Sequence, residues 1–120
     1  MSVGAHAYPR ETTEARLRDI LRGTIRSMEP HVTMIAQTAG LGSPGVDVLI
    51  CAGGYFVAVE VKRPGRKATA RQRATLDKVK AAGGRSYLVS SAEDIEKLAH
   101  ELSNLIRRRT KVEDIFLWNY

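Results

Sequence analysis

The sequence predicts a single α/β domain in which helices flank a mixed central β-sheet. Stretches rich in β-branched residues alternate with stretches whose apolar residues recur every three or four positions, as in chains where strands alternate with helices. Glycine, proline and helix-capping residues separate these stretches. With 120 residues the chain is long enough for one modest core. The expected order of elements is α-β-β-β-α-β-α, which gives a sheet covered by helices.

The expected domain covers residues 11–108. Residues 1–10 are expected to form a flexible N-terminal arm. Residues 109–120 form a C-terminal tail with several large apolar side chains, which suits packing on the domain or a contact between two copies of the chain. The side chains in question are Phe116, Leu117, Trp118 and Tyr120.

The first helix is expected to start after Thr12 or Thr13, since either residue can act as its N-cap. Glu14 then lies in the first turn, where the helix dipole favours negative charge. Pro30 closes the segment. The apolar face of this helix is expected to consist of Leu17, Ile20, Leu21, Ile25 and Met28.

Three strands are expected next. Residues 32–36 form a short strand, and residues 38–44 form a loop that contains two glycines and a proline. Residues 46–51 and 55–62 are rich in β-branched and aromatic residues. The pair Gly53-Gly54 lies between them, which predicts a β-hairpin with a tight turn.

The hairpin places two acids face to face. If the two glycines form the loop, Ala52 pairs with Tyr55 and Asp47 lies opposite Glu60, with Lys62 on the same face. Like charges that face each other destabilise a sheet, and an uncompensated charge among apolar neighbours is costly. A divalent cation between the carboxylates would resolve this, and Mg²⁺ commonly takes one or two protein carboxylates together with water and phosphate oxygens. A three-residue turn would instead place Asp47 opposite Val59.

A basic turn at residues 63–67 leads into the second helix. Thr69 is its expected N-cap, and Gln72 three residues later completes a capping box. Gln72 also lies four and seven residues before Leu76 and Val79, so it faces inward with them. A capping role and a functional role for Gln72 are therefore compatible. A glycine pair ends the helix.

The last strand is expected at residues 85–89, parallel to the strand at 55–62 if both belong to one sheet. Ser90 and Glu93 predict a capping box for the third helix. Its apolar positions are Ile95, Leu98, Leu102, Leu105 and Ile106. The basic run 107–109 that follows also suits a helix C-terminus.

Composition narrows the function. The net charge of +6 and the pI of about 9.8 favour an anionic partner, with nucleic acid as the first candidate. Cys51 is the only cysteine, so an intrachain disulfide and a cysteine-based zinc cluster are excluded. We find no apolar run of membrane-spanning length and no signal peptide, so a cytoplasmic, reducing compartment is expected.

Six of the twelve residues from 62 to 73 are basic. Such charge runs are usually solvated surface, but this one adjoins the expected carboxylate pair, which favours contact with DNA phosphates. Beside Lys62, the expected DNA-binding residues are Arg63, Arg66, Lys67, Arg71 and Arg73.

The chain resembles the PD-(D/E)xK nuclease superfamily at Asp47, at Glu60-Val61-Lys62 and at Gln72. Within that superfamily it is most similar to the virus-type replication-repair nuclease (VRR-NUC) domain, whose central block resembles the segment from Phe56 to Gly65. The resemblance covers roughly residues 11–94. It departs from the family where Val46, instead of proline, precedes the aspartate.

The resemblance implies a fold with the metal-binding acids on a central hairpin, which agrees with the geometry expected from the strands. It implies that Asp47 and Glu60 bind Mg²⁺ or Mn²⁺ and that Lys62 positions or activates the attacking water. Glu14 matches the family's helical acid and is a further expected metal ligand. Gln72 matches the polar residue on the helix after the hairpin.

Each of these residues also has a purely structural interpretation. Glu60 and Lys62 could be solvated charges on an edge strand, or Lys62 could form a salt bridge with Asp47. Glu14 could be no more than a first-turn acid, in which case Glu11 is the alternative ligand. Gln72 could serve the helix cap alone.

The function expected from these observations is metal-dependent hydrolysis of DNA phosphodiester bonds by an endonuclease. By similarity to stand-alone domains that resolve Holliday junctions, the expected substrate is branched DNA and the expected assembly is a homodimer. A general or nicking endonuclease would use the same residues. A DNA-binding module without catalysis is the alternative from another class.

Overall fold

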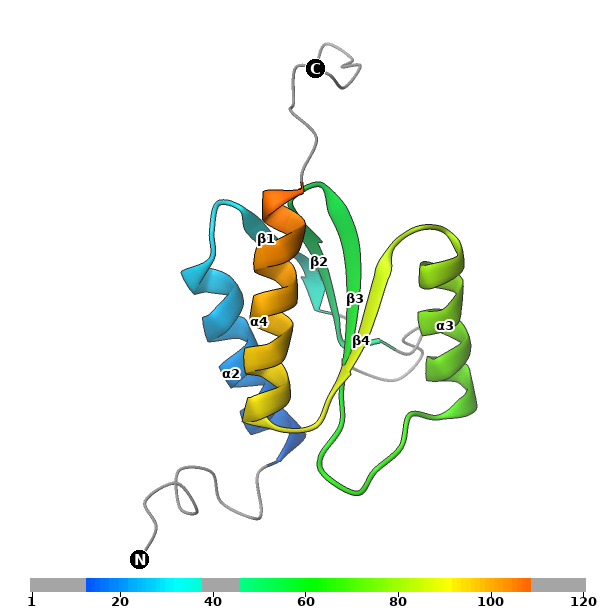
Figure 1. The fold of residues 1–120 in the computed structure, drawn as a ribbon. Coiled ribbons are helices and arrows are strands. Elements are labelled where there is room, and N and C mark those ends of the chain that lie inside the picture. Colours follow the sequence, from blue (N-terminus) through cyan, green and yellow to red (C-terminus); the bar gives the residue numbers. More distant parts are fainter. Residues whose placement is uncertain (1–12, 38–45, 109–120) are drawn as a thin grey trace, which may run out of the picture.

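A computed structural model describes residues 13–37 and 46–108 of the chain. The described part is an α/β fold, which confirms the predicted class of a mixed sheet flanked by helices (Figure 1). The predicted arm 1–10, loop 38–44 and tail 109–120 lie outside the described residues, as does Glu11. The elements are α2 (Glu14–Ser27), β1 (Val32–Gln37), β2 (Val48–Ala52), β3 (Tyr55–Val61), α3 (Ala70–Ala81), β4 (Arg85–Val89) and α4 (Ala92–Arg107).

The four strands lie in the order β1-β2-β3-β4, so β1 and β4 are the edge strands of the described sheet. β1 pairs with β2, and β2 with β3, in antiparallel fashion. β3 and β4 are parallel, as predicted, and α3 connects them. Parallel neighbours need such a crossover because a short turn cannot bring the chain back to the same end of the sheet.

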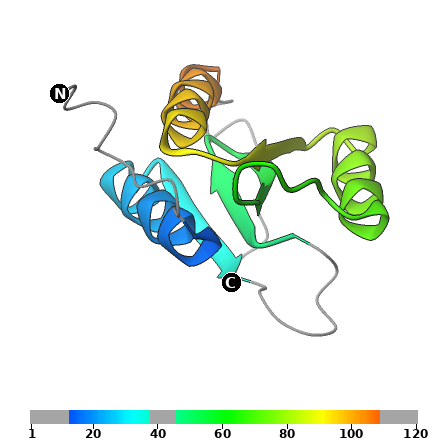
Figure 2. The same ribbon diagram turned by 90° about the horizontal axis from the view of Figure 1, so that it is seen from below.

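The helices form two layers of unequal size. α2 and α4 cover one face of the sheet, and α3 lies alone on the other (Figures 1 and 2). The main core lies on the α2 and α4 side, and its large buried side chains include Leu17, Leu21, Ile25, Ile50, Ile95 and Leu102. A smaller buried cluster lies on the α3 side and consists of Val46, Ala58 and Leu76.

The hairpin between β2 and β3 has the predicted two-residue loop. Ala52 pairs with Tyr55, and the register continues to Val48 opposite Val59. Gly53 and Gly54 both have positive φ, +57° and +88°, as a two-residue loop of type I′ requires. The alternative three-residue turn is therefore excluded.

The predicted caps of the first two described helices are correct. Thr13 caps α2, and its side chain accepts a hydrogen bond from the backbone N–H of Arg16. Thr69 caps α3 and forms the predicted capping box with Gln72. These caps supply acceptors for backbone N–H groups that have no partner within the helix.

The predicted cap of α4 is wrong by one residue. The N-cap is Ser91, whose side chain accepts from the N–H of Asp94, while the Asp94 carboxylate accepts from the N–H of Ser90. Both serines precede an acid by three residues, so the sequence allows either box. Strand pairing extends through Val89, whose carbonyl accepts from the N–H of Lys62, and the helix starts correspondingly late.

In the described part of the chain, no helix has the length and apolar character needed to cross a bilayer.

Candidate active site

Two acidic side chains are buried in the described part of the molecule. Asp47 is 7% exposed and Glu60 is 2% exposed. Asp47 directly precedes β2 and Glu60 lies near the end of β3, one step beyond the last register pair of the hairpin. Asp47 Oδ2 accepts a hydrogen bond of 2.8 Å from the N–H of Val61, which fixes the carboxylate beside β3. The predicted juxtaposition of the two acids is therefore present.

Lys62 follows Glu60 on the same side of β3. Its Nζ lies 3.5 Å from Glu60 Oε2, and only 15% of its side chain is exposed. This contact differs from the structural alternative in which Lys62 pairs with Asp47. Glu60, Lys62 and Asp47 thus form one group of buried and half-buried charges.

The surroundings of the Glu60 carboxyl shift its pKa. Burial, and after it the nearby charge of Asp47, raise the pKa of Glu60 from 4.5 to about 7, against the opposing effect of Lys62. A raised pKa means that the ionised form is disfavoured. Burial is the main reason that ionisation of Glu60 is disfavoured, and the negative charge of Asp47 adds to it.

Gln72 caps α3, as predicted, and also contacts Glu60. Its Oε1 accepts a hydrogen bond of 2.9 Å from the N–H of Thr69, which completes the cap of α3. Its Nε2 donates a hydrogen bond of 2.8 Å to Glu60 Oε2. The capping box therefore holds the amide in one orientation, and that orientation presents a donor to the buried carboxylate.

Arg18 belongs to the site although it was not among the predicted residues. Its Nε lies 3.2 Å from Asp47 Oδ1, and one of its terminal nitrogens lies 3.4 Å from Glu14 Oε1. The contact between Arg18 and Glu14 could have been predicted from the sequence, because Arg18 follows Glu14 by four residues and shares its helix face. The contact with Asp47 depends on how α2 crosses the sheet, which no local pattern encodes.

Glu14 lies at the margin of this group. Its Oε2 accepts a hydrogen bond of 3.4 Å from the N–H of Arg63, just beyond β3, while its Oε1 contacts Arg18. Arg18 therefore links Glu14 to Asp47. Among residues 13–37 and 46–108, no cluster of three or more His, Cys, Asp or Glu side chains is arranged to hold a metal ion. The structure brings Asp47 and Glu60 together, and Glu14 joins them only through Arg18.

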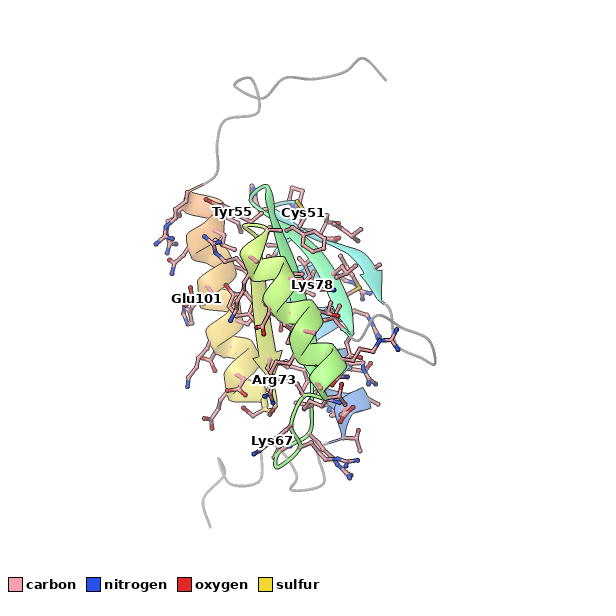
Figure 3. The ribbon with its side chains drawn as sticks, turned by 90° about the vertical axis from the view of Figure 1, so that its right-hand side faces the viewer. Cys51, Tyr55, Lys67, Arg73, Lys78 and Glu101 are labelled. Atoms are coloured by element: carbon pink, nitrogen blue, oxygen red, sulfur yellow. The ribbon has the colours of Figure 1, made fainter. Side chains whose placement is uncertain are left out.

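The predicted DNA-binding residues surround the start of α3, and all five are exposed. Figure 3 labels two of them, Lys67 in the loop below α3 and Arg73 near the start of the helix. Tyr55 and Cys51, at the hairpin end, lie far up in the same view. The basic residues therefore gather at the end of the sheet that carries Asp47 and Glu60. The five residues are Arg63, Arg66, Lys67, Arg71 and Arg73.

The donor set suits a hard divalent cation. Carboxylate oxygens are the preferred protein ligands of Mg²⁺, which completes its coordination with water and phosphate oxygens. Burial, and after it the charge of Asp47, disfavour the ionised form of Glu60, and a bound cation would offset both effects. Asp47 and Glu60 are the residues that would hold such an ion, with Lys62, Gln72 and Arg18 in contact with them.

The sequence has no match among models of known protein families, and no curated protein is significantly similar to it.

Proposed function

We propose that this chain is a Mg²⁺- or Mn²⁺-dependent DNA endonuclease with a PD-(D/E)xK-type core similar to the VRR-NUC domain. One observation carries the proposal: the buried Asp47 and Glu60 carboxylates lie together at the open end of the hairpin, away from the Gly53-Gly54 loop, with Lys62 in contact with Glu60. Two neighbouring buried acids destabilise a fold unless cations compensate their charge, so their presence here favours a bound metal ion. The basic residues around this end of the sheet supply the contacts that a DNA backbone needs.

The residues have distinct roles in the proposed reaction. A bound Mg²⁺ or Mn²⁺ supplies a Lewis acid that lowers the pKa of a water molecule and stabilises charge on the phosphate. Asp47 and Glu60 hold the ion, and the Lys62 ammonium orients the attacking water for in-line attack on the phosphodiester. Gln72 fixes the Glu60 carboxylate. Arg18 fixes Asp47.

The proposed substrate is branched DNA, including Holliday junctions. This part of the proposal is supported by the resemblance to stand-alone nuclease domains that act on junctions. A general or nicking endonuclease would use the same residues, and a comparison of cleavage of junction, duplex and single-stranded DNA separates the two.

The decisive experiment is cleavage of a labelled four-way junction beside linear duplex and single strand, in Mn²⁺ and in Mg²⁺. Wild-type protein should cut the junction symmetrically and should be inactive in EDTA. Lys62→Ala and Glu60→Gln should each reduce the rate by at least about a hundredfold, since each removes a group that acts in the transition state. Equal cutting of all DNAs would retain the nuclease and discard the junction. Activity in EDTA, or undiminished activity of both variants, would overturn the site assignment.

A DNA-binding module without catalysis is the second candidate. It is favoured by the protein contacts that already engage the acids, since Arg18 pairs with Asp47 and both Lys62 and Gln72 contact Glu60. In that case the carboxylates serve the fold. Strongly salt-dependent DNA binding without cleavage in either metal would support this candidate.

A further inference from the structure

A second feature of the molecule is a cavity of about 310 Å³ between α3 and the edge strand β4. Its walls come from the loop at residues 66–68, from one side of α3 and from residues 86–88 of β4. Asp47, Glu60 and Lys62 do not line it. The volume lies at the lower end of the range for small-molecule sites, which suits one group of about the size of a nucleotide.

Four cationic side chains converge on this cavity, namely Arg66, Lys67, Arg73 and Lys80. Arg73 and Lys80 are seven residues apart and share a helix face with Asp77, the one acid in the walls. Within the described residues, none of the four cations takes part in a salt bridge. The cavity therefore has an excess of positive charge, and an anionic group is the expected occupant.

The remaining walls are largely apolar. Leu76 and Leu88 line the cavity together with the cations, whereas the side chain of Tyr87 packs against the main core on the other face of the sheet. Leu88 is 43% exposed. An apolar wall beside cations that form no salt bridge matches the two parts of a nucleotide, since a base can lie on the apolar side chains and a phosphate can bind the cations.

The cavity lies next to the candidate active site. Leu88 is the direct partner of Glu60 in the parallel pairing of β3 and β4, and neighbouring strands are about 4.8 Å apart. Gln72, which contacts Glu60, directly precedes Arg73 in α3. Successive phosphates of one DNA strand advance by roughly 3.4 Å along the duplex axis. A strand whose phosphate lies at Glu60 can therefore place a neighbouring nucleotide at the cavity.

We propose that this cavity binds one unpaired nucleotide of the DNA strand, close to the phosphodiester that is cut. Its phosphate contacts the four cations, and its base lies against Leu88. A base inside a duplex is stacked and paired and has to leave the stack to enter a cavity. The site therefore favours DNA with unpaired nucleotides, as at a branch. This inference rests on the proposed nuclease function and specifies its substrate.

The test compares the same substitution, lysine to glutamate, at two positions of α3. Lys80 lines the cavity, whereas the exposed Lys78 does not. Binding to a fluorescent continuous duplex, and to the same duplex ending in a single-stranded fork, is measured by anisotropy with full-length protein in EDTA. Lys80→Glu should weaken binding to the fork by about tenfold. Lys78→Glu should weaken it less than about twofold, and the two variants should affect duplex binding alike.

A second arm tests the base. Wild-type protein should lose about fivefold in affinity when the unpaired nucleotide next to the fork junction is made abasic, whereas Leu88→Ala should bind both DNAs equally. Equal effects of Lys78→Glu and Lys80→Glu on the fork, or an abasic effect that persists in Leu88→Ala, would overturn the cavity assignment while leaving the nuclease proposal intact. Failure of every form to bind either DNA would overturn both.

Discussion

The side chain of Gln72 forms two hydrogen bonds: it accepts one from the N–H of the N-cap residue Thr69 and donates one to the buried carboxylate of Glu60. The sequence predicts the first bond, because a capping box is a local pattern. The second bond, to Glu60, follows from the inward position that Gln72 shares with Leu76. Arg18 differs in this respect, since its contact with Asp47 joins residues 29 positions apart on elements with no local connection. The capping bond lies within one helix, and the sequence predicts it, whereas the bond to Glu60 joins α3 to β3 and is permitted but not specified by the inward position of Gln72.

The titration of Glu60 gives a first prediction. The pKa of Glu60 is about 7 in the folded protein, compared with 4.5 for an unperturbed glutamate, so the folded state binds the proton more tightly than the unfolded state. This contribution to stability is complete below pH 4.5 and is lost as the pH rises through 7. The gap corresponds to on the order of 3 kcal/mol. Urea unfolding in EDTA should therefore show that Glu60→Gln is more stable than wild type at pH 8 and that this advantage shrinks toward pH 5. An advantage independent of pH would contradict the assignment.

The contact between Arg18 and Asp47 gives a second prediction. Arg18→Ala should lower the free energy of unfolding in EDTA by about 1–3 kcal/mol, because it leaves a buried carboxylate without its charged partner. The same change should tighten Mg²⁺ binding, since the guanidinium no longer competes for Asp47. Isothermal titration with Mg²⁺ measures this effect.

Arg22→Ala is the matched control for Arg18→Ala. Arg22 lies one turn further along α2, and its pairing with Asp19 is exposed. Surface pairs of this kind contribute little, on the order of 0–1 kcal/mol. Equal destabilisation by Arg18→Ala and Arg22→Ala would show that the Arg18–Asp47 pair contributes no more to the free energy of unfolding than an exposed pair does.

Among the elements, the hairpin between β2 and β3 matters most for the site. Its register, which sets Asp47 beside Glu60, follows from the two-residue glycine loop and the alternation of strand side chains. The sequence therefore predicts this element well. It predicts the start of α4 less well, because Ser90 and Ser91 offer equivalent local patterns and the length of β4 decides between them.

The hairpin loop gives a third prediction. A Cβ at Gly53 would lie 2.7 Å from the carbonyl oxygen of Leu105 and 2.8 Å from Cα of Ile106, so the loop packs directly on the backbone of α4. Gly53→Ala should therefore cost more than the strain of its positive φ alone, about 2 kcal/mol or more. Gly54→Ala meets the same φ restriction but has no atom within 4 Å of the added carbon. Thermal unfolding should rank Gly54→Ala as the milder change, and the reverse ranking would refute the proposed close approach.

At the scale of the whole molecule, the α/β class could be predicted from periodicity and capping, and the parallel pairing of β3 with β4 from the helical crossover between them, on the condition that both strands belong to one sheet. These features depend on hydrophobic patterns that tertiary packing reinforces. The distribution of helices over the two sheet faces could not be predicted, since each helix presents an apolar side that fits either face. The position of Arg18 and the cavity beside β4 both depend on that distribution.

The expected homodimer gives a prediction at this scale. Two copies related by a two-fold axis would offer two active sites to the two strands of a junction. Light scattering coupled to gel filtration should therefore give twice the mass of the 13.2 kDa chain at micromolar concentration. A monomer mass throughout this range would remove the dimer from the proposal without affecting the carboxylate site.

The unequal helix layers imply unequal local stability. On the side of α2 and α4 a continuous core includes many fully buried side chains, whereas the buried cluster under α3 consists of Val46, Ala58 and Leu76. Segments with few buried contacts open at a lower free energy than the whole domain, and amide hydrogen exchange detects such partial opening. The amide hydrogens of α3 are therefore expected to exchange faster than those of α2 and α4, while the rest of the sheet stays folded. The candidate site thus lies at the border between the larger core and the less extensively buried layer that α3 forms.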